Sequence, residues 1–183
     1  MKKVRYVARI IFCLLMVFIF CVVGYNIAMK RLHPIKYSEQ ITQYSKEFEV
    51  DPSLVAAVIK CESSFNKDAV SSANARGLMQ LTEETFCDVS KMLGESDAFS
   101  FEAHWDDADV NIRYGTRYLK FLLDMFDGNE TSAVAAYNAG LGNVKGWMGD
   151  DGKLTTDEIK FPETYDYVDK VQSAKKYYSK HYR

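Results

Sequence analysis

An uninterrupted apolar segment close to the N-terminus constrains this chain more than any other feature. It covers Ile10 to Met29, twenty residues without a charge, in which Asn26 is the one strongly polar side chain. A helix of that length rises about 30 Å, which matches the hydrocarbon core of a bilayer. Residues 1–36 contain seven Lys and Arg and no Asp or Glu, so cations flank the segment on both sides. The segment therefore predicts a single transmembrane anchor.

A cleaved signal peptide and a buried core helix are the two alternatives to an anchor. The apolar core of a signal peptide usually spans about 7–15 residues and ends at small residues of A-x-A type, and none precede Lys30. A core helix rarely combines such uniform apolarity with cations at both ends. Four basic residues precede the segment and three follow it closely, so the positive-inside bias is slight. We expect the N-terminus inside and the remaining domain outside the membrane.

The remainder of the chain is acidic. Residues 37–183 hold 16 Lys and Arg against all 25 Asp and Glu, a net charge of −9. Because nucleic-acid binding needs a basic surface for the phosphates, nucleic acid is excluded as a partner. The length suits one globular domain behind the anchor. The predicted parts are a cytoplasmic N-terminus (1–9), the transmembrane anchor (10–29), a linker (30–40) and a domain (41–183).

The domain is expected to be mainly α, without strands or internal repeats. Asp51-Pro52-Ser53 is a typical helix start, since Asp caps the first amides and Pro fits the first turn. The apolar residues that follow recur at the spacing of one helix face: Leu54, Val55, Val58 and Ile59. Further helices are predicted from about residue 82, over residues 110–126 and 131–139, and from about 163 to 178.

Glu62 continues the apolar face of the first of these helices, four residues beyond Val58. If that helix ends before Asn66, the carboxylate lies close to the negative end of the helix dipole. Burial and the dipole both penalise the ionised form, so both raise the pKa. A general acid that works near neutral pH needs such a pKa. A lone Glu with this spacing is more often a partly exposed helix-end residue, so the spacing alone does not establish catalysis.

Three motifs give Glu62 a context: Glu62-Ser63-Ser64-Phe65-Asn66, Gly77-Leu78-Met79-Gln80 and Ala136-Tyr137-Asn138-Ala139-Gly140. In order and spacing they resemble the signature motifs of the soluble lytic transglycosylase family. Two further segments resemble other parts of that family: Asn111-Ile112 with Gly115-Thr116 and Tyr118-Leu119, and Pro162-Glu163-Thr164 with Tyr167-Val168. The resemblance covers about residues 41 to 178.

The resemblance implies a lysozyme-like helical fold with a glycan-binding groove. It implies cleavage of the β-1,4 bond between N-acetylmuramic acid and N-acetylglucosamine in the glycan strands of peptidoglycan, with 1,6-anhydromuramic acid as the new end. By motif, Glu62 is the catalytic acid/base. The residues implied for substrate binding are Gln80, Tyr137 and Asn138, with Ser71, Met79 and Glu163 as further candidates.

Each of these residues has an expected role or an alternative to it. Gln80 offers a donor and an acceptor together, which suits sugar hydroxyls. Tyr137 is expected to hydrogen-bond near Glu62 or near the acetamido group of the substrate. Met79 forms an adaptable apolar floor or packs in the core.

Two other functions stay open at this point. A hydrolytic muramidase of related fold needs a positioned water and usually a second carboxylate, for which Asp106, Asp107 and Glu163 are candidates. A catalytically silent wall-binding module of an envelope or secretion machine is the other alternative, and it has no need of an acid at Glu62.

No metal or cofactor is expected. The three His residues show no ligand spacing: His33, His104 and His181. The segment 149–152 resembles half of a calcium loop, but Trp147 and Gly149 stand where oxygen ligands belong. We interpret that segment as a solvated acidic turn.

Two local features concern the structure of the domain itself. Cys61 and Cys87 allow a disulfide in an external domain, while two buried thiols are the default interpretation. Asn74 stands where the family usually has Gly. Because Asn tolerates a left-handed backbone better than most residues, the turn is expected to survive.

Overall fold

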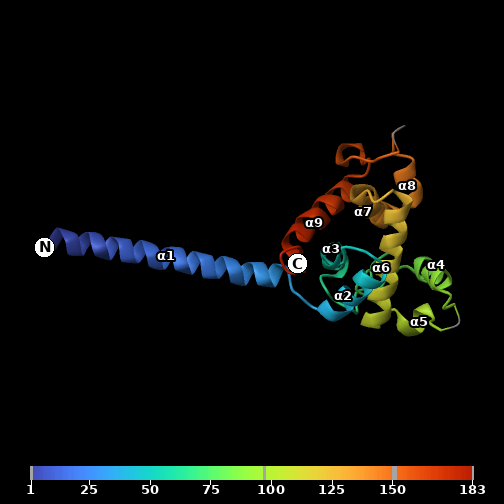
Figure 1. Ribbon diagram of the computed structural model, residues 1–183, viewed down its shortest axis with the longest axis horizontal. Coiled ribbons are helices and arrows are strands. Elements are labelled where there is room, and N and C mark those ends of the chain that lie inside the picture. The colour runs from blue at the N-terminus through green and yellow to red at the C-terminus, as the bar shows by residue number, and fades with distance from the viewer. Residues whose placement is uncertain (1, 97, 150–151, 183) are drawn as a thin grey trace. The chain divides into compact units, whose positions relative to one another are not determined.

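The computed structural model describes residues 2–96, 98–149 and 152–182 (Figure 1). It divides into two units, residues 1–35 and residues 36–183. The predicted acidic turn falls partly on residues 150–151, which lie outside the described residues.

The first unit contains one helix, α1, Lys2–Leu32. Its segment Ile11–Leu32 has a mean hydropathy of 2.5, and none of the apolar window is buried. Twenty-two helical residues rise about 33 Å, enough to cross a bilayer. Since the helix buries none of its apolar window, it is not a core helix, and its length and composition fit membrane association.

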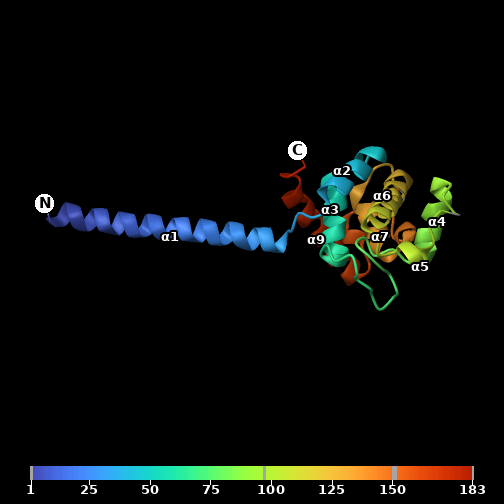
Figure 2. The ribbon, with the colours of Figure 1, turned by 90° about the horizontal axis from the view of Figure 1, so that it is seen from below.

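The second unit is a helical domain (Figures 1 and 2). Its elements are α2 (Ser38–Glu47), α3 (Pro52–Ser63), α4 (Glu83–Leu93), α5 (Phe101–His104), α6 (Ala108–Met125), α7 (Glu130–Ala139), α8 (Leu141–Lys145), the 3-10 helix η1 (Thr156–Glu158) and α9 (Pro162–Tyr178). The described residues form isolated antiparallel bridges at Arg76 but no strand. The predicted mainly α class is confirmed. Helices α6, α7 and α9 begin and end within two residues of their expected positions, and α3 and α4 begin where they were expected.

Polar caps define where the helices begin. Four N-cap side chains accept a hydrogen bond from an N–H group of the first turn: Asp51 of α3, Thr82 of α4, Asp107 of α6 and Asn129 of α7. Pro52 occupies the first turn of α3 as predicted. Because a cap fixes the starting residue, it also fixes which residues of each helix face the interior.

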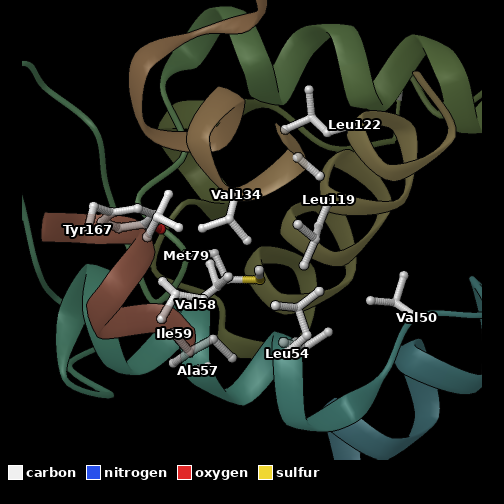
Figure 3. Close-up of a cluster of buried hydrophobic side chains, with 14 of the residues drawn as sticks. Val50, Leu54, Ala57, Val58, Ile59, Met79, Leu119, Leu122, Val134 and Tyr167 are labelled. Carbon is white, nitrogen blue, oxygen red and sulfur yellow. The ribbon is translucent and has the colours of Figure 1, made fainter. Parts of the chain in front are cut away.

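Two hydrophobic clusters fill the domain. The main core lies around α3, whose residues from Leu54 to Ile59 are at most 2% exposed, and it includes residues of α6, α7 and α9. Figure 3 shows Val58, Leu119 and Val134 converging there from different helices. The minor core lies between α4, α5 and α6 and consists of Leu81, Phe86, Val89, Phe101, Val110 and Tyr114. Helix α6 contributes to both clusters.

The domain thiols are not joined. Cys61 and Cys87 are both free, so the disulfide alternative is wrong. Cys61 is half-buried, and burial raises the pKa of its thiol to about 11. Cys87 is exposed, which corrects the expectation of two buried thiols. The reason is that α4 covers the minor core with one face and leaves the face bearing Cys87 to solvent.

Candidate active site

Glu62 lies in the last turn of α3, at the edge of the main core. The helix ends one residue later, and Ser64 takes a left-handed conformation with φ 51°. The carboxyl is therefore close to the negative end of the helix, as the sequence predicted. Its side chain is half-buried.

Tyr167 of α9 supplies the direct partner of Glu62. Its hydroxyl donates a hydrogen bond of 2.5 Å to Glu62 Oε1. Burial raises the pKa of Glu62 from 4.5 to about 7, and the Tyr167 hydrogen bond opposes that rise because it stabilises the ionised form. Burial and the charge of Glu62 raise the pKa of Tyr167, so this hydroxyl stays protonated and remains a donor. The predicted direction of the Glu62 shift is confirmed.

Tyr137 lies close to this pair, in the last turn of α7. Burial and then the charge of Glu62 raise its pKa well above the ordinary value. Its hydroxyl donates to the backbone carbonyl of Met79 at 2.8 Å. This hydrogen bond ties α7 to the Gly77–Gln80 loop. The expected hydrogen bond near Glu62 or the acetamido group stays a prediction.

Met79 belongs to the main core. Its side chain is fully buried, and a Cβ on Gly115 of α6 would overlap its sulfur and Cβ atoms. A side chain without exposed surface is not available to a sugar, so the predicted apolar floor is corrected to the alternative, core packing. Met79 contributes through its backbone, whose carbonyl accepts from Tyr137 and whose N–H donates to Asn111.

Gln80 is held within the loop that precedes α4. Its backbone is left-handed at φ 48°, and its side-chain Nε2 donates to the carbonyls of Ala69 and Gly77 at 3.0 and 2.9 Å. Both amide N–H groups are thus engaged internally. Gln80 therefore does not offer a donor and an acceptor together, as was expected. Its side-chain carbonyl oxygen is the atom that suits a sugar hydroxyl, as an acceptor.

The same loop contains Ser71 and Asn74. Ser71 is exposed, and its Oγ accepts from the N–H of Ala75 at 3.0 Å. Asn74 has φ 60°, which confirms that the turn tolerates Asn in place of Gly. Arg76 closes the loop by pairing its backbone with Leu81. The loop is therefore fixed by its own hydrogen bonds.

Asn138 and Glu163 lie where α7 and α9 approach one another. Asn138 is exposed, and its Oδ1 accepts from the hydroxyl of Thr164 at 2.7 Å. Glu163 is exposed in the first turn of α9, one helical turn before Tyr167. Residues four apart share a helix face, so Glu163 lies on the side of α9 that carries Tyr167.

The other candidate carboxylates have different surroundings. Asp107 is the N-cap of α6 and accepts from two backbone N–H groups there. Asp106 is exposed. The groups that shift the pKa of Glu62 include no second carboxylate. No cluster of His, Cys, Asp and Glu suited to a metal occurs in the part of the chain that the structure describes.

Tyr167 is the candidate site residue that the sequence did not single out. Its segment resembled the family, but Tyr167 was not among the predicted site residues. One signal was available: a Tyr on the apolar face of a helix, next to Val168 and Val171, needs a partner for its buried hydroxyl. Glu62 is an acidic residue that the sequence already placed on an apolar helix face.

Comparisons with known proteins place these residues in a family. Residues 39–160 match the family described as "Transglycosylase SLT domain". The chain belongs to this family. It is 32% identical, over 79% of its own length and 23% of the relative, to the soluble lytic murein transglycosylase of Salmonella typhimurium. It is 35% identical, over 83% of its length and 48% of the relative, to membrane-bound lytic murein transglycosylase C of Yersinia enterocolitica.

Solved structures agree with the family and the fold. The 70-kDa soluble lytic transglycosylase of Escherichia coli matches with a TM-score of 0.76 and 31% identity, over 81% of this chain and 25% of that one. An inactive Glu-to-Gln variant of lytic transglycosylase Slt from Pseudomonas aeruginosa matches with a TM-score of 0.75 and 33% identity, over the same shares. The predicted lysozyme-like helical fold is confirmed for this SLT-family domain. The chain spans about a quarter of the length of the soluble relatives it matches.

Proposed function

We propose that this SLT-family chain is a peptidoglycan lytic transglycosylase with Glu62 as its one catalytic acid/base. The observation that carries the proposal is the pairing of a half-buried Glu62, whose pKa is about 7, with the Tyr167 hydroxyl. A carboxyl with that pKa is populated in both protonation states near neutral pH, and the reaction needs both.

In the first step, protonated Glu62 donates its proton to the glycosidic oxygen between N-acetylmuramic acid and N-acetylglucosamine. The bond from the muramic anomeric carbon to that oxygen breaks, and N-acetylglucosamine leaves with a free hydroxyl. The 2-acetamido group of the muramic residue stabilises the positive charge at the anomeric carbon. Tyr167 stabilises the carboxylate that remains, since its hydroxyl already donates to Oε1.

In the second step, ionised Glu62 takes the proton of the muramic 6-hydroxyl. The 6-oxygen then bonds to the anomeric carbon, which gives the 1,6-anhydro end and returns Glu62 to its protonated form. Because the nucleophile belongs to the substrate, it is already held near the reacting carbon and no water has to be positioned. A second carboxylate is therefore unnecessary, which fits the absence of one from the groups that shift the pKa of Glu62.

Substrate contacts are proposed for the residues around the pair. Gln80 is assigned an acceptor role through its carbonyl oxygen, since its N–H groups bind Ala69 and Gly77. Asn138 and Glu163 are exposed on the α7 and α9 side. Ser71 is exposed on the loop that precedes α4. Tyr137 is assigned a supporting role, because its hydroxyl is bound to Met79.

We also propose that residues 10–29 anchor the domain in the cell membrane, with residues 1–9 inside and residues 41–183 outside, facing the wall. The apolar helix α1 supports the anchor, and the Yersinia relative is named as membrane-bound. Protease added to intact cells should remove the domain, whereas full protection would reverse the orientation. Glycan strands near the membrane are the proposed partner, and an envelope or secretion machine is a further candidate.

Digestion of purified sacculi, followed by mass spectrometry of the products, tests the reaction. We expect anhydro ends from the wild type and loss of at least about a thousandfold in turnover from Glu62→Gln. The matched control is Glu84→Gln, an exposed Glu on α4, which should digest as the wild type does. Products heavier by one water would instead identify a muramidase. Undiminished turnover in Glu62→Gln would remove Glu62 from the mechanism.

Binding of bulgecin A provides a readout that does not depend on turnover, since a similar 70-kDa soluble lytic transglycosylase forms a complex with it. Glu62→Gln protein that still binds bulgecin A but releases no product has lost chemistry alone. Wild-type protein that binds glycan strands and bulgecin A but never cleaves would identify a wall-binding module.

A further inference from the structure

The C-terminal end of the domain is set apart by its charge. Residues 170–183 contain five Lys and Arg and no Asp or Glu, whereas residues 37–169 contain 11 Lys and Arg against 25 Asp and Glu. Lys175 is paired with Asp51 and Glu130. Lys176 and Lys180 are exposed. The proposed reaction uses none of these cations.

This basic end lies beside the start of α2, at one side of the domain in both views (Figures 1 and 2). A surface hollow of about 560 Å³ is lined by residues from both segments: Ser38, Glu39, Thr42, Gln43, His181 and Tyr182. Tyr177 and Tyr182 are half-buried and pack on the main core. We name the surface formed by residues 38–43 and 176–182 the tail face.

The composition of the tail face is that of a membrane–water interface. Tyr rings that bury one side in apolar surroundings and keep a polar hydroxyl gather at such interfaces. Clustered Lys next to a membrane segment is attracted by anionic lipid headgroups. Glu39 is the one carboxylate lining the hollow, whereas the exposed Lys176 and Lys180 lie elsewhere on the tail face.

The connection between α1 and α2 is short. Residues 33–37 separate Leu32 from Ser38, and Tyr37 already packs on the main core of the domain. Four extended residues reach about 15 Å at most. Once α1 is inserted in a bilayer, the start of α2 therefore cannot move far from the headgroups. The sequence adds Lys30, Arg31 and Lys36 along this connection.

We propose that the tail face rests on the headgroups of anionic phospholipids and so fixes one orientation of the domain on the membrane, an inference that rests on the proposed anchor. The charge separation supports one orientation, since an anionic surface attracts residues 170–183 and repels the acidic remainder of the domain. The contact is electrostatic, so it weakens as salt is added.

The test uses the full chain inserted in nanodiscs of phosphatidylcholine alone or of phosphatidylcholine mixed with phosphatidylglycerol. Amine labelling followed by mass spectrometry compares Lys176 and Lys180 with Lys91 and Lys145, which are also exposed. We expect the first two to be labelled about threefold more slowly in the anionic discs and to recover in high salt, with the second two unchanged. Equal rates in the two kinds of disc would overturn the inference.

A charge-reversal pair gives the second measurement. In Lys176→Glu/Lys180→Glu, hydrogen exchange at residues 38–43 and 179–182 should become the same in both kinds of disc. The matched control Lys91→Glu/Lys145→Glu makes the same charge change elsewhere and should keep the lipid dependence. Two outcomes contradict the proposal. One is a lipid dependence that survives in Lys176→Glu/Lys180→Glu, and the other is protection that appears only after glycan fragments are added.

The anchor is measured separately by co-purification with the discs. A chain that fails to enter discs overturns both the anchor and this inference. A chain that enters discs with unprotected Lys176 and Lys180 overturns the inference alone, and sacculus digestion continues to report the enzymatic proposal independently.

Discussion

The main core and the minor core hold the two parts of the domain by different means. In the main core, α3 packs against α2 and α9 through aliphatic side chains that are almost completely buried. In the minor core, aromatic rings predominate, and polar side chains close the surface around them. Arg76 illustrates this, since its guanidinium lies 5.1 Å from the ring centre of Phe101 and 5.5 Å from that of Trp105, and it pairs with Glu102.

This difference explains why the acid lies where it does. Glu62 borders the main core, and burial there sets its pKa with a single polar partner, Tyr167. The effect of apolar burial depends little on salt, so the pKa of Glu62 should change little with ionic strength. The region around α4 and α5 is held instead by paired charges and amide hydrogen bonds, which respond to salt and to single substitutions. The two regions should therefore fail under different perturbations.

Asn111 joins the two regions, and its removal should have the largest effect. It is 1% exposed, accepts from Met79 N–H at 2.8 Å and donates to the carbonyls of Arg76 and Trp105. Asn111→Ala removes the side-chain partner of the Met79 N–H and of the Trp105 carbonyl, whereas the Arg76 carbonyl still accepts from Leu81 N–H. We expect a loss of about 3 kcal/mol in urea denaturation. Asn143→Ala, which removes an exposed side-chain hydrogen bond to Ala139, should cost under about 0.5 kcal/mol. Similar losses in both variants would mean that Asn111 is not the connection.

Glu62→Gln tests the effect of burial in the main core through the pH dependence of stability. The folded pKa of about 7 exceeds the ordinary 4.5, so the folded state binds the proton more tightly. The contribution of Glu62 to the free energy of unfolding is therefore fully present below about pH 4. It is lost as the pH rises towards about 7, which lowers the free energy of unfolding by about 3 kcal/mol in total. Gln has no proton to lose, so the variant should be more stable than the wild type at about pH 8 and similar at about pH 4.

Thermal unfolding of both proteins across that range measures the difference. The control is Glu84→Gln on the exposed surface of α4, whose stability should follow that of the wild type at every pH. A constant offset between Glu62→Gln and the wild type at all pH values would contradict the raised pKa.

Tyr167→Phe tests the polar partner of the acid. The hydrogen bond lowers the pKa of Glu62, so its loss should raise that pKa above about 7. Activity that needs protonated Glu62 is lost as the pH rises through this pKa, so the alkaline limb of the kcat/KM profile should move to higher pH. We also expect kcat to fall by about tenfold, because the carboxylate formed in the first step loses its donor. Tyr165→Phe changes an exposed Tyr on the same helix and should leave both unchanged. A fall in kcat without movement of the limb would indicate a packing role for Tyr167.

Local sequence signals account for much of this fold and for part of the site. The start of α3 follows from Asp51 and Pro52, because a cap and a first-turn proline act within three residues. The raised pKa of Glu62 follows from its place on an apolar helix face. The left-handed Asn74 follows from the intrinsic backbone tolerance of Asn. Each of these properties depends on neighbours in sequence.

The properties that escaped prediction depend on distant partners. Tyr167 lies 105 residues from Glu62, so no local pattern joins the two. Motifs identify residues that gather near a site, but they do not say which atoms are already bonded. For this reason the burial of Met79 and the internal hydrogen bonds of Gln80 emerged only from the fold. The exposure of Cys87 likewise depends on which face of α4 meets the minor core.

Substitution of Arg113 should have the smallest effect. It tests most directly how the region around α4 and α5 is stabilised. Its Nη1 donates to both oxygens of Glu95 at 2.7 and 2.8 Å, and its Nε donates to Glu47 at 3.3 Å. The side chains of Arg113 and Glu95 are about three-quarters buried, so the pair is screened less than an open surface pair.

Arg113→Met keeps the apolar stem but removes the charge that joins α2, α6 and the segment after α4. We expect a loss of about 1 kcal/mol at low salt, which shrinks at high salt as the wild-type pair is screened. Lys91→Met removes an exposed pair with Asp88 within α4 and should leave the free energy of unfolding as in the wild type. Hydrogen exchange should quicken around Glu95 and α5 in Arg113→Met while α3 keeps its protection, because the main core does not depend on this pair. Faster exchange spread evenly over α3 and α5 would show instead that the two regions are stabilised as one.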